Sequence, residues 1–351
     1  MRRLLDYGGG IHAFDAGYVR PELAAIHLVV DSDRVAVIDS GSGASLPRVE
    51  EALSALGLAS GNVDYVFLTH VHLDHAGGAG IMMQRFSNAQ LVVHPRGVRH
   101  MADPRSLWSA VCTVYGTEQA RALYGELLPV PTERIVAAAD RARLRLGSRE
   151  LEILETPGHA KHHICIRDGA TGGIFTGDVF GLSYREFDQP SDQLSDEPAG
   201  PDAESVADDG TRRFIFPTTS PSQFDPIAMH RSIDLLVSLQ PPALFLTHFG
   251  RIRAIPQLVA RLRRLIDGHV AVALRERDAG AGREARIRAG LARLLLDELR
   301  AFGSTMPQER ALELMATDLD LNAQGLDHWL RTAHAASPRA HLPDQVAACG
   351  R

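Results

Sequence analysis

The ten residues from Thr69 to Gly78 read THVHLDHAGG and place three histidines and an aspartate at the end of an apolar run. Alternate side chains of an extended strand point to the same side, so His70 and His72 can face one way, with Asp74 continuing the row. The turn into a helix that starts at the glycines can bring His75 to that side. Imidazoles and carboxylates bind zinc and other divalent ions, so we predict a metal site here.

Three later segments each place a further candidate ligand at the end of an apolar run. They are ETPGH, IFTGD and ALFLTH, which end at His159, Asp178 and His248. Four ligands from one short segment cannot easily enclose two metal ions, whereas side chains from several strand ends can meet at one rim of a sheet. Burying this many unpaired polar groups without a metal would be unfavourable, so we predict that the whole set forms one metal centre.

Composition limits the classes of function. The chain has 351 residues, a formal net charge of −6 and 45% hydrophobic residues, which gives no general basic surface for nucleic acid. Its three cysteines, Cys112, Cys165 and Cys349, are odd in number and far apart, so neither a disulfide framework nor a thiolate zinc site is expected. No apolar run approaches the roughly 20 residues of a membrane span. We therefore expect a cytoplasmic protein with a small-molecule substrate, with no nucleic-acid or membrane partner, and with a homodimer as one option.

The order of the apolar patterns predicts an α/β fold. Strand-like runs at 25–31, 34–41, 63–70 and 89–95 alternate with helical patterns, and a hairpin-rich β section follows at 143–180. Alternation of this kind indicates sheets with helices packed outside them. We expect a main domain over residues 1–255 and a helical region over residues 256–351. The segment 187–213 is acidic and rich in Pro and Gly, which predicts an exposed, flexible insertion.

The motifs in their order resemble the metallo-β-lactamase fold superfamily, in particular its glyoxalase II-like branch. They are HxHxDH at 70–75, TPGH at 156–159, GD at 177–178 and a strand-terminal histidine at 248, within a resemblance that covers roughly residues 8–255. The resemblance implies a four-layer αββα sandwich with the metals at one edge, followed here by a helical appendage. It also implies that the first metal binds His70, His72 and His159, that the second binds Asp74, His75 and His248, and that Asp178 bridges them.

The expected function is that of a metal-dependent hydrolase. Two divalent ions, zinc or alternatively iron or manganese, would share a hydroxide that attacks an ester, thioester or lactone. Asp74, Asp178 and Tyr184 are expected to be catalytic, Tyr184 by reaching the substrate oxyanion, with ordinary packing as its alternative reading. The alternatives from other classes are a mononuclear iron persulfide dioxygenase, a phosphodiesterase of the same fold, and a binding protein that keeps a metal only for stability.

Several other residues are expected to support the centre. Asp39 in VIDSG resembles the family's strand-terminal DTG or DSG and is predicted to support the metal loop by hydrogen bonding. Relatives often read TPGHxxGH, so His163 matches the last histidine and His162 replaces the glycine, with a supporting role expected for both. Three phenylalanines either line a pocket or pack in the core: Phe214, Phe216 and Phe224.

Overall fold

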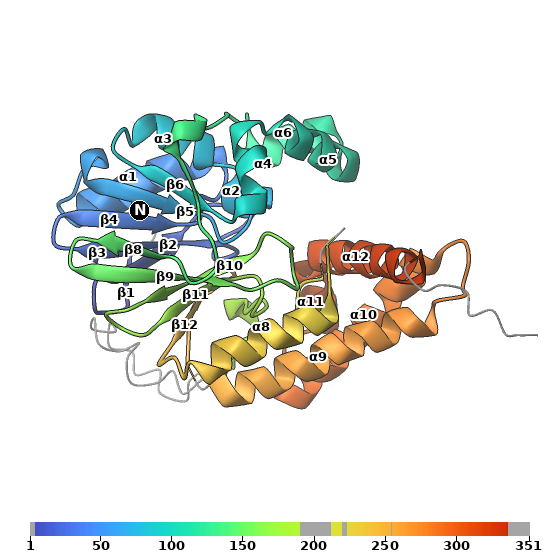
Figure 1. Ribbon diagram of the computed structural model, residues 1–351. Helices are drawn as coiled ribbons and strands as arrows, with labels where there is room; N and C mark the ends of the chain where they lie inside the picture. The colour runs from blue at the N-terminus through green and yellow to red at the C-terminus, as the bar shows by residue number, and fades with distance from the viewer. Residues whose placement is uncertain (1–3, 190–211, 220–222, 254, 336–351) are drawn as a thin grey trace, which may run out of the picture.

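Two stacked β-sheets form the centre of the protein, as the computed structural model shows over residues 4–189, 212–219, 223–253 and 255–335 (Figure 1). The first sheet has seven strands, which lie in chain order: β1 (Leu5–Asp6), β2 (Ile11–Asp15), β3 (Ala25–Asp31), β4 (Arg34–Ile38), β5 (Val63–Phe67), β6 (Gln90–Val93) and β7 (Ile135–Ala137). The second sheet has six strands, in the order β13-β12-β11-β10-β9-β8. These are β8 (Arg143–Leu146), β9 (Arg149–Glu155), β10 (Ile164–Asp168), β11 (Ile174–Gly177), β12 (Leu244–Leu246) and β13 (Gly250–Ile252).

The helices lie outside the two sheets and beyond one edge of the sandwich (Figure 1). Parallel neighbours need a crossover, and helices supply it between β4, β5, β6 and β7 and, with α8, between β11 and β12. The helices are α1 (Leu46–Ala55), α2 (Leu73–Ala76), α3 (Ala79–Arg85), α4 (Val98–Ala102), α5 (Arg105–Tyr115), α6 (Thr117–Tyr124), α8 (Pro226–Ser238), α9 (Ile255–Arg275), α10 (Arg283–Phe302), α11 (Gln308–Leu314) and α12 (Ala316–Ala335). The predicted αββα sandwich with C-terminal helices is confirmed.

Three buried apolar clusters hold the four layers together. Along β4, Val37 packs toward the helices, while Ile38 packs between the sheets with Ile166. Both faces of these strands are therefore buried, which explains why their sequences are continuous apolar runs. Each fully buried large apolar side chain contributes about 1.5–3 kcal/mol. The third cluster joins the second sheet to α8 and α9 and continues into α12, so the C-terminal helices share a core with the sheet.

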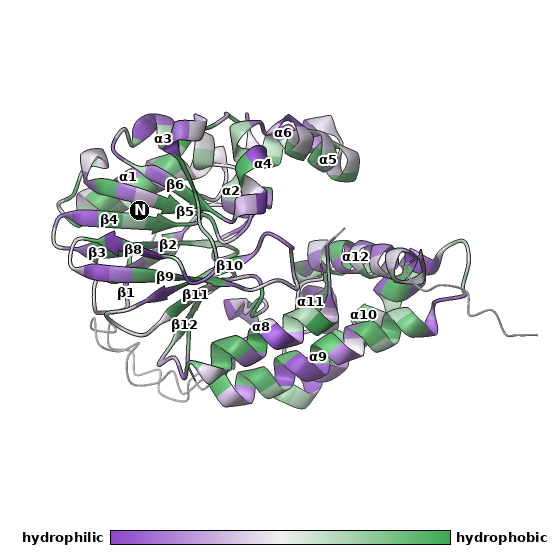
Figure 2. Cartoon of the chain, in the orientation of Figure 1, coloured by the Kyte–Doolittle hydropathy of each residue, from purple (hydrophilic) through white to green (hydrophobic). Residues whose placement is uncertain are grey.

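The long helices α9 and α10 are amphipathic, which Figure 2 shows as alternating green and purple along their length. Leu262 and Leu265 of α9 and Leu291 and Leu295 of α10 are fully buried in the shared cluster. Apolar residues at this helical spacing bury one face, so the sequence pattern predicted these helices correctly. Among the described residues, no helix combines the length and the apolar character needed to cross a membrane.

The acidic insertion lies mostly outside the described residues, because its residues 190–211 are not among them. Its two ends are anchored. Phe187 is buried, and Asp188 accepts a hydrogen bond from the Phe214 N–H at 3.3 Å and pairs with Arg213. Phe214, Phe216 and Phe224 all pack in the shared cluster, which favours the core interpretation of these residues. The division at residue 255 and the flexibility of the insertion stay predictions.

A buried histidine in α9 predicts how stability depends on pH. His269 donates from Nδ1 to the Leu265 carbonyl oxygen at 2.7 Å, and burial lowers its pKa to about 4. The folded protein therefore keeps His269 neutral, while the unfolded chain takes up a proton below its ordinary pKa near 6.5. Stability is lost as pH falls from about 6.5 to 4, by about 3 kcal/mol for a shift of this size. We expect His269→Leu to lose about 3 kcal/mol less stability than wild type over this pH range, while other buried histidines such as His72 keep their own contributions.

The measurement is urea unfolding of metal-free wild type and variant at several pH values between 4.5 and 7.5. The matched control is His328→Gln on α12, because this histidine is exposed and should leave the slope unchanged. If wild type and His269→Leu lose stability in parallel on acidification, His269 does not carry the effect.

Candidate metal centre

The ligand-rich segment leaves the first sheet at one end of β5. The strand ends at Phe67, three residues earlier than the run 63–70 suggested, and α2 begins at Leu73. The loop between them is held in place because the Ile164 N–H of β10 donates to the Thr69 carbonyl oxygen at 2.7 Å. The candidate ligands thus lie in a loop and a helical turn at the rim of the sandwich.

His70, His72 and His159 form the first group of candidate ligands. The Nε2 atoms of His70 and of His159 each lie 2.9 Å from Nδ1 of His72, so three ring nitrogens converge. His159 follows the Pro157-Gly158 turn after β9. A Cβ at Gly158 would lie 2.4 Å from the Met229 Cα of α8, and its φ is +140°, so only glycine fits where the turn passes this helix.

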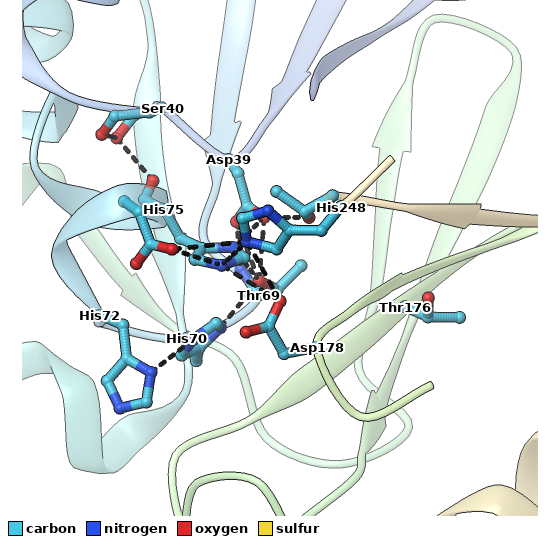
Figure 3. Close-up of polar contacts among 12 residues, drawn as sticks. Asp39, Ser40, Thr69, His70, His72, His75, Thr176, Asp178 and His248 are labelled. Atoms are coloured by element: carbon cyan, nitrogen blue, oxygen red, sulfur yellow. Dashed lines mark hydrogen bonds and ion pairs between the residues drawn. The ribbon is translucent and has the colours of Figure 1, made fainter. Parts of the chain in front are cut away.

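Asp74, His75 and His248 form the second group. His248 comes from the end of β12, and its Nε2 lies 3.3 Å from Nε2 of His75 and 3.4 Å from Oδ2 of Asp74. Figure 3 shows the His75 and His248 rings turned toward each other, with the Asp178 carboxylate beside them. Three donor atoms from two distant parts of the chain therefore converge at a second point.

Asp178 lies between the two groups. Its Oδ1 is 3.2 Å from Nε2 of His75, and its Oδ2 is 3.5 Å from Nε2 of His159. Oδ1 is buried and has no hydrogen-bond partner among the described residues, which is the situation of an atom that would bind a metal. The preceding Gly177 has a φ of +48°, and a Cβ there would lie 2.7 Å from both His163 and Thr69. The GD pair therefore needs its glycine.

The second ring nitrogens of three histidines are occupied. Nδ1 of His75 donates to Asp39 at 2.7 Å, that of His248 to the Leu23 carbonyl oxygen at 2.7 Å, and that of His159 to the Thr218 carbonyl oxygen at 3.4 Å. Each bond keeps a proton on Nδ1, so Nε2 is the nitrogen that faces the centre and is available to a metal, as is usual for metal-binding histidines. The residues therefore fit two divalent ions well.

Asp39 joins the ligand loops, as predicted. Its buried carboxylate accepts hydrogen bonds from the Thr69 N–H at 2.8 Å, the Thr69 hydroxyl at 3.0 Å, His75 and the Thr247 hydroxyl at 2.8 Å. Asp39 has a φ of 59°, in the left-handed region that aspartate tolerates better than most residues. One side chain at the end of β4 thus connects the loops that carry His70, His75 and His248.

His162 and His163 support the centre, as the sequence suggested. Nε2 of His163 accepts the Asp178 backbone N–H at 3.2 Å, and Nδ1 of His162 accepts the Val71 N–H at 3.4 Å. Neither residue belongs to the groups of converging ligand atoms in the described part of the chain. Their contacts hold the backbone beside candidate ligands.

The two groups differ in their electrostatics. Burial lowers the pKa of His70 and His159, and lowers that of His72 to about 3, so these imidazoles are neutral near pH 7. Burial also opposes charge on His75, but the carboxylates of Asp178, Asp39 and Asp74 outweigh it and raise the His75 pKa well above its ordinary value. Metal ions at the second group would replace protons there, which makes metal binding pH-dependent.

The hydroxyl of Tyr184 makes no hydrogen bond to a candidate ligand among the described residues. The hydroxyl donates to Asp318 of α12 at 3.0 Å, and the Arg20 guanidinium lies 4.5 Å from the centre of its ring. Burial, followed by the Asp318 charge, raises the Tyr184 pKa, and the Asp178 charge acts in the same direction. Its catalytic role stays a prediction.

All seven candidate ligands predicted from sequence lie together, although their roles as ligands stay predictions: His70, His72, Asp74, His75, His159, Asp178 and His248. Sequence reasoning missed the contribution of α12. Asp318 beside Tyr184 and Asn322 beside Thr219 are ordinary polar residues of a helix, and no local motif marks them.

Two curated hydrolases are similar in sequence to part of this chain. The chain is 31% identical over 172 residues to the acyl-coenzyme A thioesterase MBLAC2 of Gallus gallus. This alignment covers 44% of this chain and 57% of that protein. It is 29% identical over 172 residues to a hydroxyacylglutathione hydrolase of Stenotrophomonas maltophilia (strain R551-3), which covers 48% of this chain and 52% of that protein. The chain thus spans about half the length of these curated relatives.

A solved structure covers nearly the whole chain. The metallo-beta-lactamase family protein TTHA1429 from Thermus thermophilus matches with a TM-score of 0.62 and 19% identity, over 94% of this chain and 96% of that one. At this identity the likeness concerns the fold alone. The sequence pattern of the metallo-beta-lactamase superfamily matches residues 19–248, which include every candidate ligand. The chain therefore belongs to the metallo-beta-lactamase superfamily.

Proposed function

We propose that the protein is a hydrolase that uses two divalent metal ions, one held by His70, His72 and His159 and the other by Asp74, His75 and His248. The observation that carries the proposal is the convergence of these ligand atoms around Asp178, whose two oxygens face the two groups. A structural zinc site is usually a closed cage of four ligands. Two incomplete three-residue groups with a shared carboxylate suit catalysis better.

The side chains suggest where a substrate would approach. His72 and Asp74 are partly exposed, whereas the other candidate ligands are buried. When bound, two ions supply a water of lowered pKa and polarise the carbonyl oxygen under attack. Asp74 would orient that water on the partly exposed side of the centre. Asp178 would keep the two groups of ligands at a fixed separation. Cys165 is not a candidate nucleophile, because burial raises its pKa to about 12.

The substrate we propose is a thioester of a small molecule, with an ester or lactone as the alternative bond. Two relatives carry the names of thioester hydrolases, the acyl-coenzyme A thioesterase and the hydroxyacylglutathione hydrolase. Tyr18, Tyr115 and Tyr124 also form an aromatic cluster: the hydroxyls of Tyr18 and Tyr124 lie 2.8 Å apart, and the ring centres of Tyr115 and Tyr124 lie 6.3 Å apart. Burial, followed by the Asp74 charge, raises the Tyr115 pKa to about 12. Such a cluster would suit the apolar part of an acyl group.

We also propose that the protein acts on a small molecule and not on nucleic acid. The overall negative charge favours a small molecule over nucleic acid as the substrate. A cytoplasmic location and a homodimer stay predictions.

Metal removal tests the proposed function. We expect the purified protein to contain about two zinc, iron or manganese ions per chain. A strong chelator should reduce hydrolysis of the preferred substrate to the uncatalysed background, because no side chain of the centre replaces the ions. Addition of divalent metal should restore it. The measurements are elemental analysis of anaerobically purified protein and initial rates on an acyl-coenzyme A, an acylglutathione, a nitrophenyl ester, a lactone and a phosphodiester.

The same experiment separates the alternatives. A single iron with oxygen uptake on a persulfide would replace the hydrolase proposal by a dioxygenase, and the second group would then need another explanation. Hydrolysis of the phosphodiester alone would identify a phosphodiesterase. Two bound ions without turnover of any substrate in the panel would count against the thioester proposal.

A further inference from the structure

Helix α12, red in Figure 1, belongs to the C-terminal part of the chain and contacts Tyr184 and the segment 217–219. Asp318 and Asn322 are four residues apart, so they lie on one face of the helix. Asp318 accepts the hydrogen bond from Tyr184 at 3.0 Å. Asn322, one turn further along, contacts the segment 217–219. This face of α12 is therefore fixed at two points near the centre.

Asn322 holds the backbone of the segment 217–219 from both ends. Its side chain is 1% exposed, its Oδ1 accepts the Thr219 N–H at 2.6 Å, and its Nδ2 donates to the Pro217 carbonyl oxygen at 3.3 Å. The Thr219 hydroxyl also donates to the Asn322 backbone oxygen at 3.2 Å. The buried amide of Asn322 thus bonds the residue before Thr218 and the residue after it, and these two hydrogen bonds fix the orientation of Thr218.

Thr218 contacts a candidate ligand. Its carbonyl oxygen accepts the hydrogen bond from Nδ1 of His159, with 3.4 Å between the atoms. His159 belongs to the first group of ligands and also lies 3.5 Å from the Asp178 carboxylate. A hydrogen bond to the outer nitrogen of a metal-binding histidine sets its tautomer and ring direction. An unbroken series of contacts thus leads from Asn322 through Thr218 to His159.

We propose that Asn322 is a positioning residue for the metal ligand His159, acting through the backbone of residues 217–219. The inference rests on the proposed metal-binding function, and it assigns part of the first metal site to a helix outside the segment that matches the family. It also gives a reason for the position of α12 in the shared apolar cluster: the helix supports the centre as well as the core.

The test is a Co²⁺ titration of metal-free, full-length protein. Asn322→Ala is made in a His248→Ala background, where the second group lacks one ligand and the first group is intact. We expect the affinity for the Co²⁺ ion to fall about tenfold, at the lower end of the range for loss of a group that orients a ligand. The visible Co²⁺ absorption bands should also change in position or intensity, because they report the geometry of the ligands. Asn322→Asp keeps the acceptor for the Thr219 N–H and should bind Co²⁺ more tightly than the alanine variant.

Asp327→Asn is the matched control for general loss of stability. Asp327 is a buried residue of α12 that pairs with Arg283 and does not contact the segment 217–219. The Asp327→Asn variant should have a lower free energy of unfolding, but its Co²⁺ affinity and absorption spectrum should be unchanged. Equal weakening of Co²⁺ binding in both variants, or wild-type binding by Asn322→Ala, would overturn the inference. Because binding is measured, a failure to find a hydrolysed substrate would affect only the proposed function.

Discussion

Asp178→Asn is expected to lower turnover by about 10²–10³-fold, with a free energy of unfolding of the metal-free protein within about 2 kcal/mol of wild type. Asparagine has the shape of aspartate but lacks its charge. Oδ1 and Oδ2 of Asp178 face His75 and His159, so the substitution removes the negative group shared by the two sites. In the metal-free protein Oδ1 of Asp178 faces His75, and its charge is one cause of the raised His75 pKa. His75 can release its proton once this charge is removed, so no buried charge is left without a partner and the loss of stability stays small. The measurements are kcat on the preferred substrate, metal content and urea unfolding.

Asp168→Asn provides the opposite control. Asp168 is also fully buried, but it pairs with Arg149 at 3.2 Å and accepts a hydrogen bond from the Thr171 N–H, away from the candidate ligands. Removing one partner of a buried ion pair costs about 3–5 kcal/mol, so this variant should lose stability while its folded fraction keeps its turnover. If Asp178→Asn instead lost activity and stability together, Asp178 would serve the fold and the binding-protein alternative would gain support.

The sequence predicted which candidate ligands lie together more fully than it predicted the individual strands around them. Each ligand candidate follows an apolar strand or turn, so a short local pattern carries both the side chain and its setting: HxHxDH after β5 and GD after β11 are examples. Glycines at 158 and 177 belong to these patterns for a steric reason, since a Cβ would collide with Met229 of α8 at the first position and with His163 and Thr69 at the second. The chemistry and the backbone requirement therefore coincide within a few residues.

What could not be predicted depends on contacts between distant segments. Strand β2 is buried along its whole length although it contains His12 and Asp15, and these polar residues hide its apolar pattern. Strands β7 and β13 have three residues each, too few to show a period. Asn322 acts on residues more than 100 positions earlier in the chain, as the Thr219 contact shows. The pattern of a single sequence does not show which distant residues are in contact. The contacts of α12 could therefore be found only from the structure.

Asp39→Asn is expected to weaken metal binding at the second group by about 10–100-fold and to destabilise the metal-free protein by about 3 kcal/mol. Asparagine keeps the shape of the side chain and tolerates the left-handed φ of 59°, so the backbone is not the cause. Oδ1 of Asp39 accepts the Thr69 N–H, whose direction cannot change, and Oδ2 accepts from His75 and from Thr247. The new NH₂ group must therefore replace Oδ2, where it faces the Nδ1–H of His75.

The tautomer of His75 would then decide the outcome. His75 can avoid two opposed donors only by losing the proton on Nδ1 and keeping one on Nε2, and Nε2 is the atom that faces Asp178 and His248. A protonated Nε2 cannot bind a metal, so the substitution acts on the second site without touching a ligand.

Metal titration gives the affinity, urea unfolding gives the stability, and ¹⁵N NMR of the histidine rings identifies the tautomer. Thr247→Val, which removes one hydroxyl from Asp39 and leaves the carboxylate to His75, should cost about 1 kcal/mol and keep wild-type metal affinity. Binding of both ions by Asp39→Asn with wild-type affinity would show that His75 keeps its orientation without this carboxylate.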